Sequence, residues 1–351
     1  MKKLVFIFSL FTVVSCTKTV VSDNEVKPDA IALQSETTSD ANTGNTKFGS
    51  SINGGFTSAK SVSIAKDLNA KYVRGKIIMS QWKGKSWQYE NYENNGIHVV
   101  LNVNYNDNNN SPFPKDMENY RKKFNSIIKK YQPEVIVVEN EEINPHYHEG
   151  PLSNYIQMLK VALDVCHSKN IKVANGGIYG PQLEVLTYRY LQTKGQKRAD
   201  SFANHCMETY QVKAAKQSNS NKDIEFKVRQ LDTLLKFYHN LDYVNVHLYE
   251  PFNPNVNPSK VNSSTPVVVE DIQEYIKSRT GRPIMTNETG QRNNTSASLV
   301  SSMMKKYDQL NFPYVVWYNG DGTADAEALY NLNTGVLYNN GIAFSKYIAS
   351  H

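Results

Sequence analysis

The sequence is poor in cysteine and tryptophan, with three of each among its 351 residues. It also lacks the apolar run of about 20 residues that a bilayer-spanning helix needs. No cysteines have the spacing of a zinc motif. The chain is too polar for a multispanning membrane protein, and its charges are too mixed and its aromatic residues, at 11%, too many for a disordered one. The length suits two average domains or one large domain of barrel size.

Neither sign of charge dominates, because the chain has 39 basic and 33 acidic residues and a formal net charge of +6. The one compact basic run, residues 194–198, has no interleaved aromatic side chains, so we predict no nucleic-acid partner. The one metal-like grouping, His146 and His148 with Glu149, is more typical of a loop. We therefore predict neither a metal nor an organic cofactor.

Residues 1–15 have the pattern of a secretory signal peptide: two lysines, a short apolar run and a small residue, Ser15, before Cys16. The four residues that end at Cys16, Val-Val-Ser-Cys, resemble a bacterial lipobox, which implies that Cys16 is lipidated and becomes the new N-terminus. Ordinary secretion with cleavage near Ser15 is the alternative. Residues 16–46 lack hydrophobic periodicity and are predicted to be a flexible tether. We therefore expect a lipid-anchored protein of the cell envelope, at the outer membrane or the cell surface.

The other two cysteines, Cys166 and Cys206, both fall in predicted helices. In an oxidising compartment they could pair, but one possible pair is not a disulfide framework. Whether they form a disulfide stays open at this point.

From residue 47 onward, short β-branched runs alternate with amphipathic stretches. Eight strands, each followed by a helix-like segment, are typical of a (β/α)8 barrel, and residues 47–351 fall within the size range of that fold. A doubly wound open sheet is the rival, but no glycine-rich phosphate loop follows the first strand. We therefore predict an α/β fold, a (β/α)8 TIM barrel that forms one catalytic domain. The predicted strands are Phe48–Ile52, Tyr72–Ile78, His98–Tyr105, Val135–Asn140, Lys172–Ile178, Tyr243–Tyr249, Pro283–Glu288 and Tyr314–Tyr318, and the predicted helices include Ser58–Leu68, Lys115–Tyr131, Ser153–Ser168, Lys227–His239, Val268–Ser278 and Ser296–Leu310.

The connection after the fifth strand, residues 180–241, is long for a barrel. Its pattern is helical, with a polar break over residues 217–221. We therefore predict an enlarged helical segment after strand 5 rather than a separate domain.

Two glutamates at strand ends carry the main functional signal. Glu141 ends the fourth predicted strand and Glu288 ends the seventh, and the C-terminal ends of barrel strands meet at one face, where active sites lie. Hydrolysis of a glycosidic bond needs such a pair: one carboxyl protonates the leaving oxygen and the other attacks the anomeric carbon, about 5–5.5 Å away in a retaining mechanism. A single strand-end glutamate more often makes a salt bridge. The pair is what favours catalysis.

These motifs resemble those of the retaining glycoside hydrolases of clan A, the barrels that include cellulases, β-mannanases, xylanases and β-galactosidases. That clan ends its fourth strand in Asn-Glu, as in Asn140-Glu141, and its seventh in a Glu often followed by a small residue and glycine, as in Glu288-Thr289-Gly290. The resemblance implies that Glu141 is the acid/base and Glu288 the nucleophile. It further implies that Asn140 hydrogen-bonds the 2-hydroxyl of the bound sugar.

Further strand-end residues match the clan in order: Arg74 on the second strand, His247 and Tyr249 on the sixth, and Trp317 on the eighth. The resemblance implies that the arginine and the tyrosine position the nucleophile and that the tryptophan ring packs beneath the bound sugar. Independently of the family, a cation beside Glu288 would lower the pKa of that carboxyl and keep it ionised. Taken alone, Arg74 could equally be a structural ion-pair partner, and His247 a core histidine.

Trp82 and Trp87, in the loop after the second strand, offer flat apolar faces suited to a pyranose ring. They are predicted to bind sugar, with the alternative that they cover hydrophobic surface. Asn104 and Tyr179 are further candidates for the pocket.

The residues around Asn140-Glu141 depart from the clan, because Glu139 and Glu142 stand where many members have a tryptophan or small residue and a proline. Glu139 lies on the same side of an ideal strand as Glu141, so like-charge repulsion could raise the pKa of either. We assign the acid to Glu141 because it follows Asn140. The third strand lacks the histidine common in family five, so the exact family stays unassigned.

Two functions follow from these patterns. The first is a retaining glycoside hydrolase that cleaves β-linked poly- or oligosaccharides by double displacement. The alternative is a non-catalytic glycan-binding surface lipoprotein on the same barrel. Binding alone needs no paired carboxylates, which favours the enzyme. The altered neighbours of Glu141 leave the glycan-binding lipoprotein as an alternative. In both cases we expect a monomer with a carbohydrate partner and a membrane contact through its lipid anchor.

Overall fold

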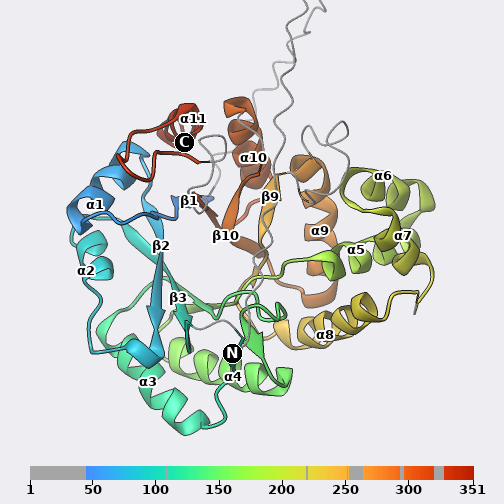
Figure 1. Ribbon diagram of the computed structural model, residues 1–351, viewed down its shortest axis with the longest axis horizontal. Helices are drawn as coiled ribbons and strands as arrows, with labels where there is room; N and C mark the ends of the chain where they lie inside the picture. The colour runs from blue at the N-terminus through green and yellow to red at the C-terminus, as the bar shows by residue number, and fades with distance from the viewer. Residues whose placement is uncertain are drawn as a thin grey trace, which may run out of the picture. The chain divides into compact units, whose positions relative to one another are not determined.

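The computed structural model describes residues 45–107, 110–218, 220–250, 252, 264–292, 296–319 and 328–351. The predicted signal peptide, Cys16 and the tether up to residue 44 lie outside the described residues. Parallel strands occupy the centre of the folded unit and helices surround them (Figure 1). Among the described residues, no helix has both the length and the apolar character needed to cross a membrane.

The strands of the main sheet are β1 (Lys47–Ser50), β2 (Tyr72–Ile78), β3 (His98–Asn104), β5 (Val135–Val138), β7 (Lys172–Asn175), β8 (Val244–Asn245), β9 (Leu248–Glu250), β10 (Ile284–Gln291) and β11 (Tyr314–Trp317). The helices are α1 (Ser58–Asp67), α2 (Trp87–Glu93), α3 (Met117–Lys130), α4 (Leu152–His167), α5 (Pro181–Lys194), α6 (Gln196–Cys206), α7 (Thr209–Lys216), α8 (Lys222–Tyr238), α9 (Ser264–Thr280), α10 (Ala297–Gln309) and α11 (Asn339–Ala349), with a short 3-10 turn at Met79–Gln81.

The strand order is β7-β5-β3-β2-β1-β11-β10-β8, with β9 also paired to β10, and all of these pairings are parallel. Two isolated parallel bridges, Ala174–Tyr243 and Ile178–Val246, link β7 to the segment around β8 and nearly close the ring. Because β8 and β9 share the sixth position, the described strands fill eight positions. The predicted (β/α)8 barrel is confirmed, although the sixth predicted strand is divided in two.

Residues 180–241 form the enlarged helical segment that the sequence predicts, with α5 to α8 in succession. The predicted polar break separates α7 from α8, and Asn221 caps α8 by accepting a hydrogen bond from the backbone N–H of Ile224. Cys166 in α4 and Cys206 in α6 are both buried and free, so they form no disulfide.

Alternation along each strand divides the core into two layers. Val100, Val137 and Val316 belong to a small cluster inside the barrel. The neighbours of Val316 along β11, Val315 and Trp317, belong instead to the large cluster between the sheet and the helices. Side-chain parity on each strand therefore decides which residues reach the active face.

A second, two-stranded pairing joins the loops after β3 and β5. There β4 (Ser111–Pro112) pairs with β6 (His148–Glu149) in parallel. This pairing places His148 beside the end of β5, because its Nε2 atom donates to the backbone oxygen of Asn140 at 2.7 Å. It therefore fixes the turn that carries the predicted acid.

Candidate active site

A chain of asparagines crosses the barrel interior beneath the strand ends. Asn102 Oδ1 accepts from Arg74 Nε at 3.2 Å and from Asn287 Nδ2 at 2.6 Å, and Asn287 Oδ1 accepts from Asn245 Nδ2 at 2.6 Å. Asn175 extends the chain by accepting from the backbone N–H of Asn245 at 2.7 Å. Buried amides are stable only when they are paired, so this chain forms a rigid polar floor. Sequence reasoning did not assign a role to these residues, although Asn102 and Asn245 lie two positions before Asn104 and His247 and so share a side with them on an ideal strand.

Glu288 is held as an ionised carboxylate. Its Oε2 atom forms an ion pair with Arg74 Nη1, and its Oε1 atom accepts from Tyr249 Oη. Burial alone would raise the pKa of Glu288, but the neighbouring His247 and Arg74 cations and the two hydrogen bonds outweigh burial and lower it to about 2. Tyr249 reaches this position because β9 pairs with β10, with Gly290 opposite Tyr249.

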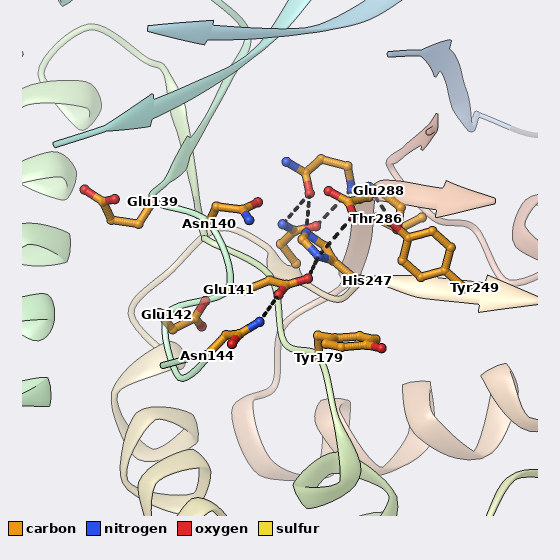
Figure 2. A network of polar contacts seen from close by, with 12 residues as sticks. Glu139, Asn140, Glu141, Glu142, Asn144, Tyr179, His247, Tyr249, Thr286 and Glu288 are labelled. Atoms are coloured by element: carbon orange, nitrogen blue, oxygen red, sulfur yellow. Dashed lines mark hydrogen bonds and ion pairs between the residues drawn. The ribbon is translucent and has the colours of Figure 1, made fainter. Parts of the chain in front are cut away.

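Glu141 faces Glu288 across the barrel mouth (Figure 2). One oxygen of each carboxylate and one nitrogen of His247 all lie within 4.8 Å of one another. Glu141 Oε2 accepts from Asn144 Nδ2 at 2.7 Å, and Oε1 lies 2.9 Å from His247 Nδ1. The Glu141 side chain is 9% exposed, so the pair is largely shielded from solvent.

His247 is fully buried and contacts both carboxylates. Its Nδ1 atom lies 2.9 Å from Glu141 and 3.9 Å from Glu288, while Nε2 lies 3.1 Å from Asn287 Oδ1. Burial opposes a charged ring, but the two carboxylates raise the pKa of His247 above its usual value. Close packing requires glycine at Gly177, whose φ is +125° and where a Cβ would lie 2.2 Å from His247 Nε2.

Glu139 points away from the other two carboxylates (Figure 2). The prediction that it shares a side with Glu141 is wrong, because β5 ends at Val138 and both glutamates adopt positive φ, +69° and +45°. Burial raises the pKa of Glu139 to about 8, although the backbone N–H of Tyr105 donates to its Oε1 at 2.7 Å. Glu139 is thus a buried, protonated carboxyl at neutral pH.

Glu142 is also turned away from Glu288. Its Oε1 atom accepts from Tyr238 Oη and from Asn175 Nδ2, and burial raises its pKa. Three glutamates lie within residues 139–142. Of these, Glu141 is the one that contacts His247 and lies close to Glu288. This geometry favours Glu141 over its two neighbours as the partner of Glu288.

A cavity of about 400 Å³ opens beside Glu288. Its walls are mostly amides and charged groups, which suits a ligand rich in hydroxyls. The predicted residues Arg74, Asn104 and Asn140 line it, and Arg74 Nη2 donates to Asn140 Oδ1 at 2.7 Å. The full lining is Ser51, Ile52, Asn53, Arg74, Lys76, Gln88, Asn102, Asn104, Asn106, Asp107, Asn140, Tyr147, His148, Glu288 and Tyr318.

None of the three tryptophans lines this cavity, which corrects a prediction. Trp317 is fully buried outside the barrel, with its ring 6.1 Å from that of Phe344 in α11, and the next residue, Tyr318, lines the cavity instead. Trp82 donates from its indole N–H to Ser126 Oγ at 2.9 Å, and Trp87 is 67% exposed. Trp82 therefore covers hydrophobic surface, as its alternative interpretation stated, and Trp87 lies on the outside.

The residues that could hold a metal among those described are Glu141, His247 and Glu288. Arg74 already neutralises Glu288, and the raised pKa of His247 favours a protonated ring, which is no ligand. We therefore interpret this cluster as two carboxylates bridged by a histidine rather than as a metal site. The grouping of His146 and His148 with Glu149 does not converge on a common point within the described residues.

No family model matches the chain, and a search of curated proteins finds no match either. Solved structures share its fold. A glucosidase from Croceicoccus marinus has a TM-score of 0.57 at 8% identity, over 86% of this chain and 65% of that one, so this chain spans just under two thirds of its length. A GH5-4 broad specificity endoglucanase from Clostridium acetobutylicum has a TM-score of 0.51 at 12% identity, over 86% and 96% of the two chains. An endo-β-1,4-mannanase from Thermotoga petrophila has a TM-score of 0.50 at 12% identity, over 86% and 76%. At such identities the likeness shows the fold alone.

Proposed function

We propose that the protein is a retaining glycoside hydrolase that cleaves β-linked poly- or oligosaccharides. The observation that carries the proposal is the approach of Glu141 and Glu288, whose oxygens lie within 4.8 Å at the C-terminal ends of the strands. Inverting enzymes keep their carboxyls about 6.5–9.5 Å apart to admit a water molecule, so the shorter separation favours retention.

In this proposal Glu288 attacks the anomeric carbon while Glu141 gives a proton to the leaving oxygen, and the glycosidic C–O bond breaks. Water then attacks the anomeric carbon, the bond from that carbon to Glu288 breaks and frees the carboxylate, and Glu141 takes up the proton that the water loses. The low pKa of Glu288, about 2, suits a nucleophile that must be ionised at neutral pH. Arg74 and Tyr249 position it, and Asn140, in the cavity wall, binds the sugar.

The names of the fold neighbours support a glycan substrate. They are a glucosidase, an endoglucanase and an endo-β-1,4-mannanase. The fold by itself is compatible with many chemistries. The proposal that this chain hydrolyses β-linked glycans therefore rests on its own pair of carboxylates, Glu141 and Glu288. A clan A assignment is part of the same proposal.

The site of action is a proposal from sequence alone. We propose that Cys16 carries a lipid, that residues 16–46 tether the barrel to it and that the protein acts as a monomer at the cell envelope. Cys16→Ser should release the protein into the soluble fraction and abolish incorporation of a labelled fatty acid. Membrane retention of that variant would contradict the anchor.

Sugar release from a panel of β-glucans, mannans, xylans and galactans, in neutral, uronate-bearing and sulfated forms, tests the function. The chain should release sugar from at least one member, and Glu288→Gln should abolish release while the matched surface change Glu118→Gln leaves it unchanged. Glu118 is a suitable control because its side chain is 70% exposed on α3. Retention on one immobilised polysaccharide without release from any member would instead favour the glycan-binding lipoprotein.

A further inference from the structure

Arg292 lies next to the candidate active site and takes no part in the proposed hydrolysis. It directly follows β10, four residues after Glu288. Its guanidinium carbon lies 3.8 Å from the centre of the Tyr249 ring, and Nη1 donates to Tyr179 Oη at 3.1 Å. The stack on Tyr249 and the bond to Tyr179 fix both the plane and the rotation of the guanidinium group.

This half-buried cation has no acidic partner among the described residues. Two other half-buried arginines have acidic partners, because Arg74 pairs with Glu288 and Arg189 pairs with Glu225. A guanidinium group has five N–H donors, and the hydrogen bond to Tyr179 Oη uses one of those of Arg292. A partly buried charge that meets no counter-ion within the described part of the chain is costly, so this position suits an anion.

The position of Arg292 relative to the two glutamates indicates which part of a substrate it would meet. The cavity of about 400 Å³ contains Glu288 and Asn140, so the sugar that Glu288 attacks lies there. Glu141 must contact the leaving oxygen, which places the leaving group beyond Glu141. In the view of Figure 2, Glu141 lies between Asn140 and Tyr179, the hydrogen-bond partner of Arg292.

We propose that Arg292, held by Tyr179 and Tyr249, binds an oxyanion on the leaving-group side of the glycan, either a uronic acid carboxylate or a sulfate ester. The inference rests on the proposed function for the direction of the leaving group. A planar guanidinium edge matches two oxygens of such a group with two parallel hydrogen bonds. The substrate class is therefore an acidic β-linked glycan rather than a neutral one.

The test measures equilibrium binding of oligosaccharides in matched sets: neutral, uronate-bearing and sulfated versions of the same β-linked backbone. The full chain carries Glu288→Gln so that bound glycans are not turned over. One acidic version should bind about tenfold or more tightly than its neutral counterpart, as expected for a charge-assisted pair. Arg292→Gln should remove that preference and leave neutral binding unchanged, and Arg292→Lys should keep part of it. Preference for the uronate or for the sulfate identifies which oxyanion is bound.

Arg121→Gln is the matched control, because the side chain of Arg121, on α3, is 41% exposed and pairs with Asp164. Its loss should leave the preference intact. Equal affinity for acidic and neutral versions, a preference that survives Arg292→Gln, or equal loss of both affinities in the two Arg292 variants would each overturn the inference. Sugar release by the chain with Glu288 intact is measured separately. Sugar release without a preference for acidic glycans would uphold the proposed function and overturn this inference. A preference for acidic glycans that depends on Arg292, without sugar release, would uphold this inference and overturn the proposed function.

Discussion

His247 Nδ1 lies 2.9 Å from Glu141 Oε1, which is hydrogen-bond distance. The other ring nitrogen, Nε2, donates to the Asn287 side-chain oxygen, which can only accept. The raised pKa of His247 favours a ring that also carries a proton on Nδ1, which then donates to Glu141. In the proposed mechanism His247 positions the acid rather than touching the sugar.

Replacing His247 by glutamine should move the alkaline limb of the pH–kcat profile to lower pH. The reason is that the site then loses an imidazole whose pKa is raised by two carboxylates and which is hydrogen-bonded to Glu141. We expect kcat to fall more than KM rises. An unchanged alkaline limb in His247→Gln would show that the pair does not control the acid.

Arg74→Met should raise the pKa of Glu288 from about 2, because burial then opposes a single neighbouring cation, His247. The acid limb of the pH–kcat/KM profile should move to higher pH, so that the variant loses activity at mildly acidic pH before the unmodified protein does. Arg74→Lys keeps the charge but loses the hydrogen bonds to Asn102 and Asn140, so its shift should be smaller. The same acid limb in all three proteins would contradict the role of Arg74.

Glu139 should make the fold less stable as the pH rises. Its pKa is 4.5 in the unfolded chain and about 8 in the fold, so between these values the folded state binds more protons and the free energy of unfolding falls with increasing pH. Glu139→Gln mimics the protonated carboxyl and should lessen that fall. Urea unfolding between pH 4.5 and pH 8 checks this, with exposed Glu118→Gln as control. Parallel curves for Glu139→Gln and the unmodified protein would refute the assignment.

Trp317 should matter for stability and not for sugar binding. Trp317→Ala removes a fully buried ring packed on Phe344 and should cost roughly 3–5 kcal/mol of unfolding free energy. Trp87→Ala, at a 67% exposed position, should change it by less than about 0.5 kcal/mol. Tyr318→Ala should raise KM while Trp317→Phe leaves KM unchanged. A raised KM in Trp317→Phe would show that Trp317 does contact the substrate.

The barrel and the glutamate pair could be predicted because both depend on patterns that a sequence carries directly. Alternating strands and helices fix the architecture, and the strand ends then bring Glu141 and Glu288 to one face even though they are far apart in the chain. Arg74 and Tyr249 follow from the same rule. Each contacts Glu288 as the resemblance implied.

The failures have a shared physical cause in side-chain parity at strand ends. A difference of one residue decides whether a side chain faces the mouth or the helices, so the prediction chose Trp317 where Tyr318 lines the cavity. At Glu139 the strand has already ended, and left-handed backbone at Glu139 and Glu141 reorients both side chains. The asparagine floor depends on pairs such as Asn102 and Asn287, which are separated by 185 residues and meet only in the folded barrel.

Identification of the covalent intermediate tests the account most directly. The chain is incubated with 2-deoxy-2-fluoro glycosides of the sugars it releases, and its intact mass and peptide masses are measured. The account predicts a gain of one fluoroglycosyl unit on the peptide that carries Glu288, with product of retained anomeric configuration from the ordinary substrate. A label on Glu139 or Glu141, or turnover that inverts the anomeric centre without any label, would contradict the assignment of Glu288 as the nucleophile.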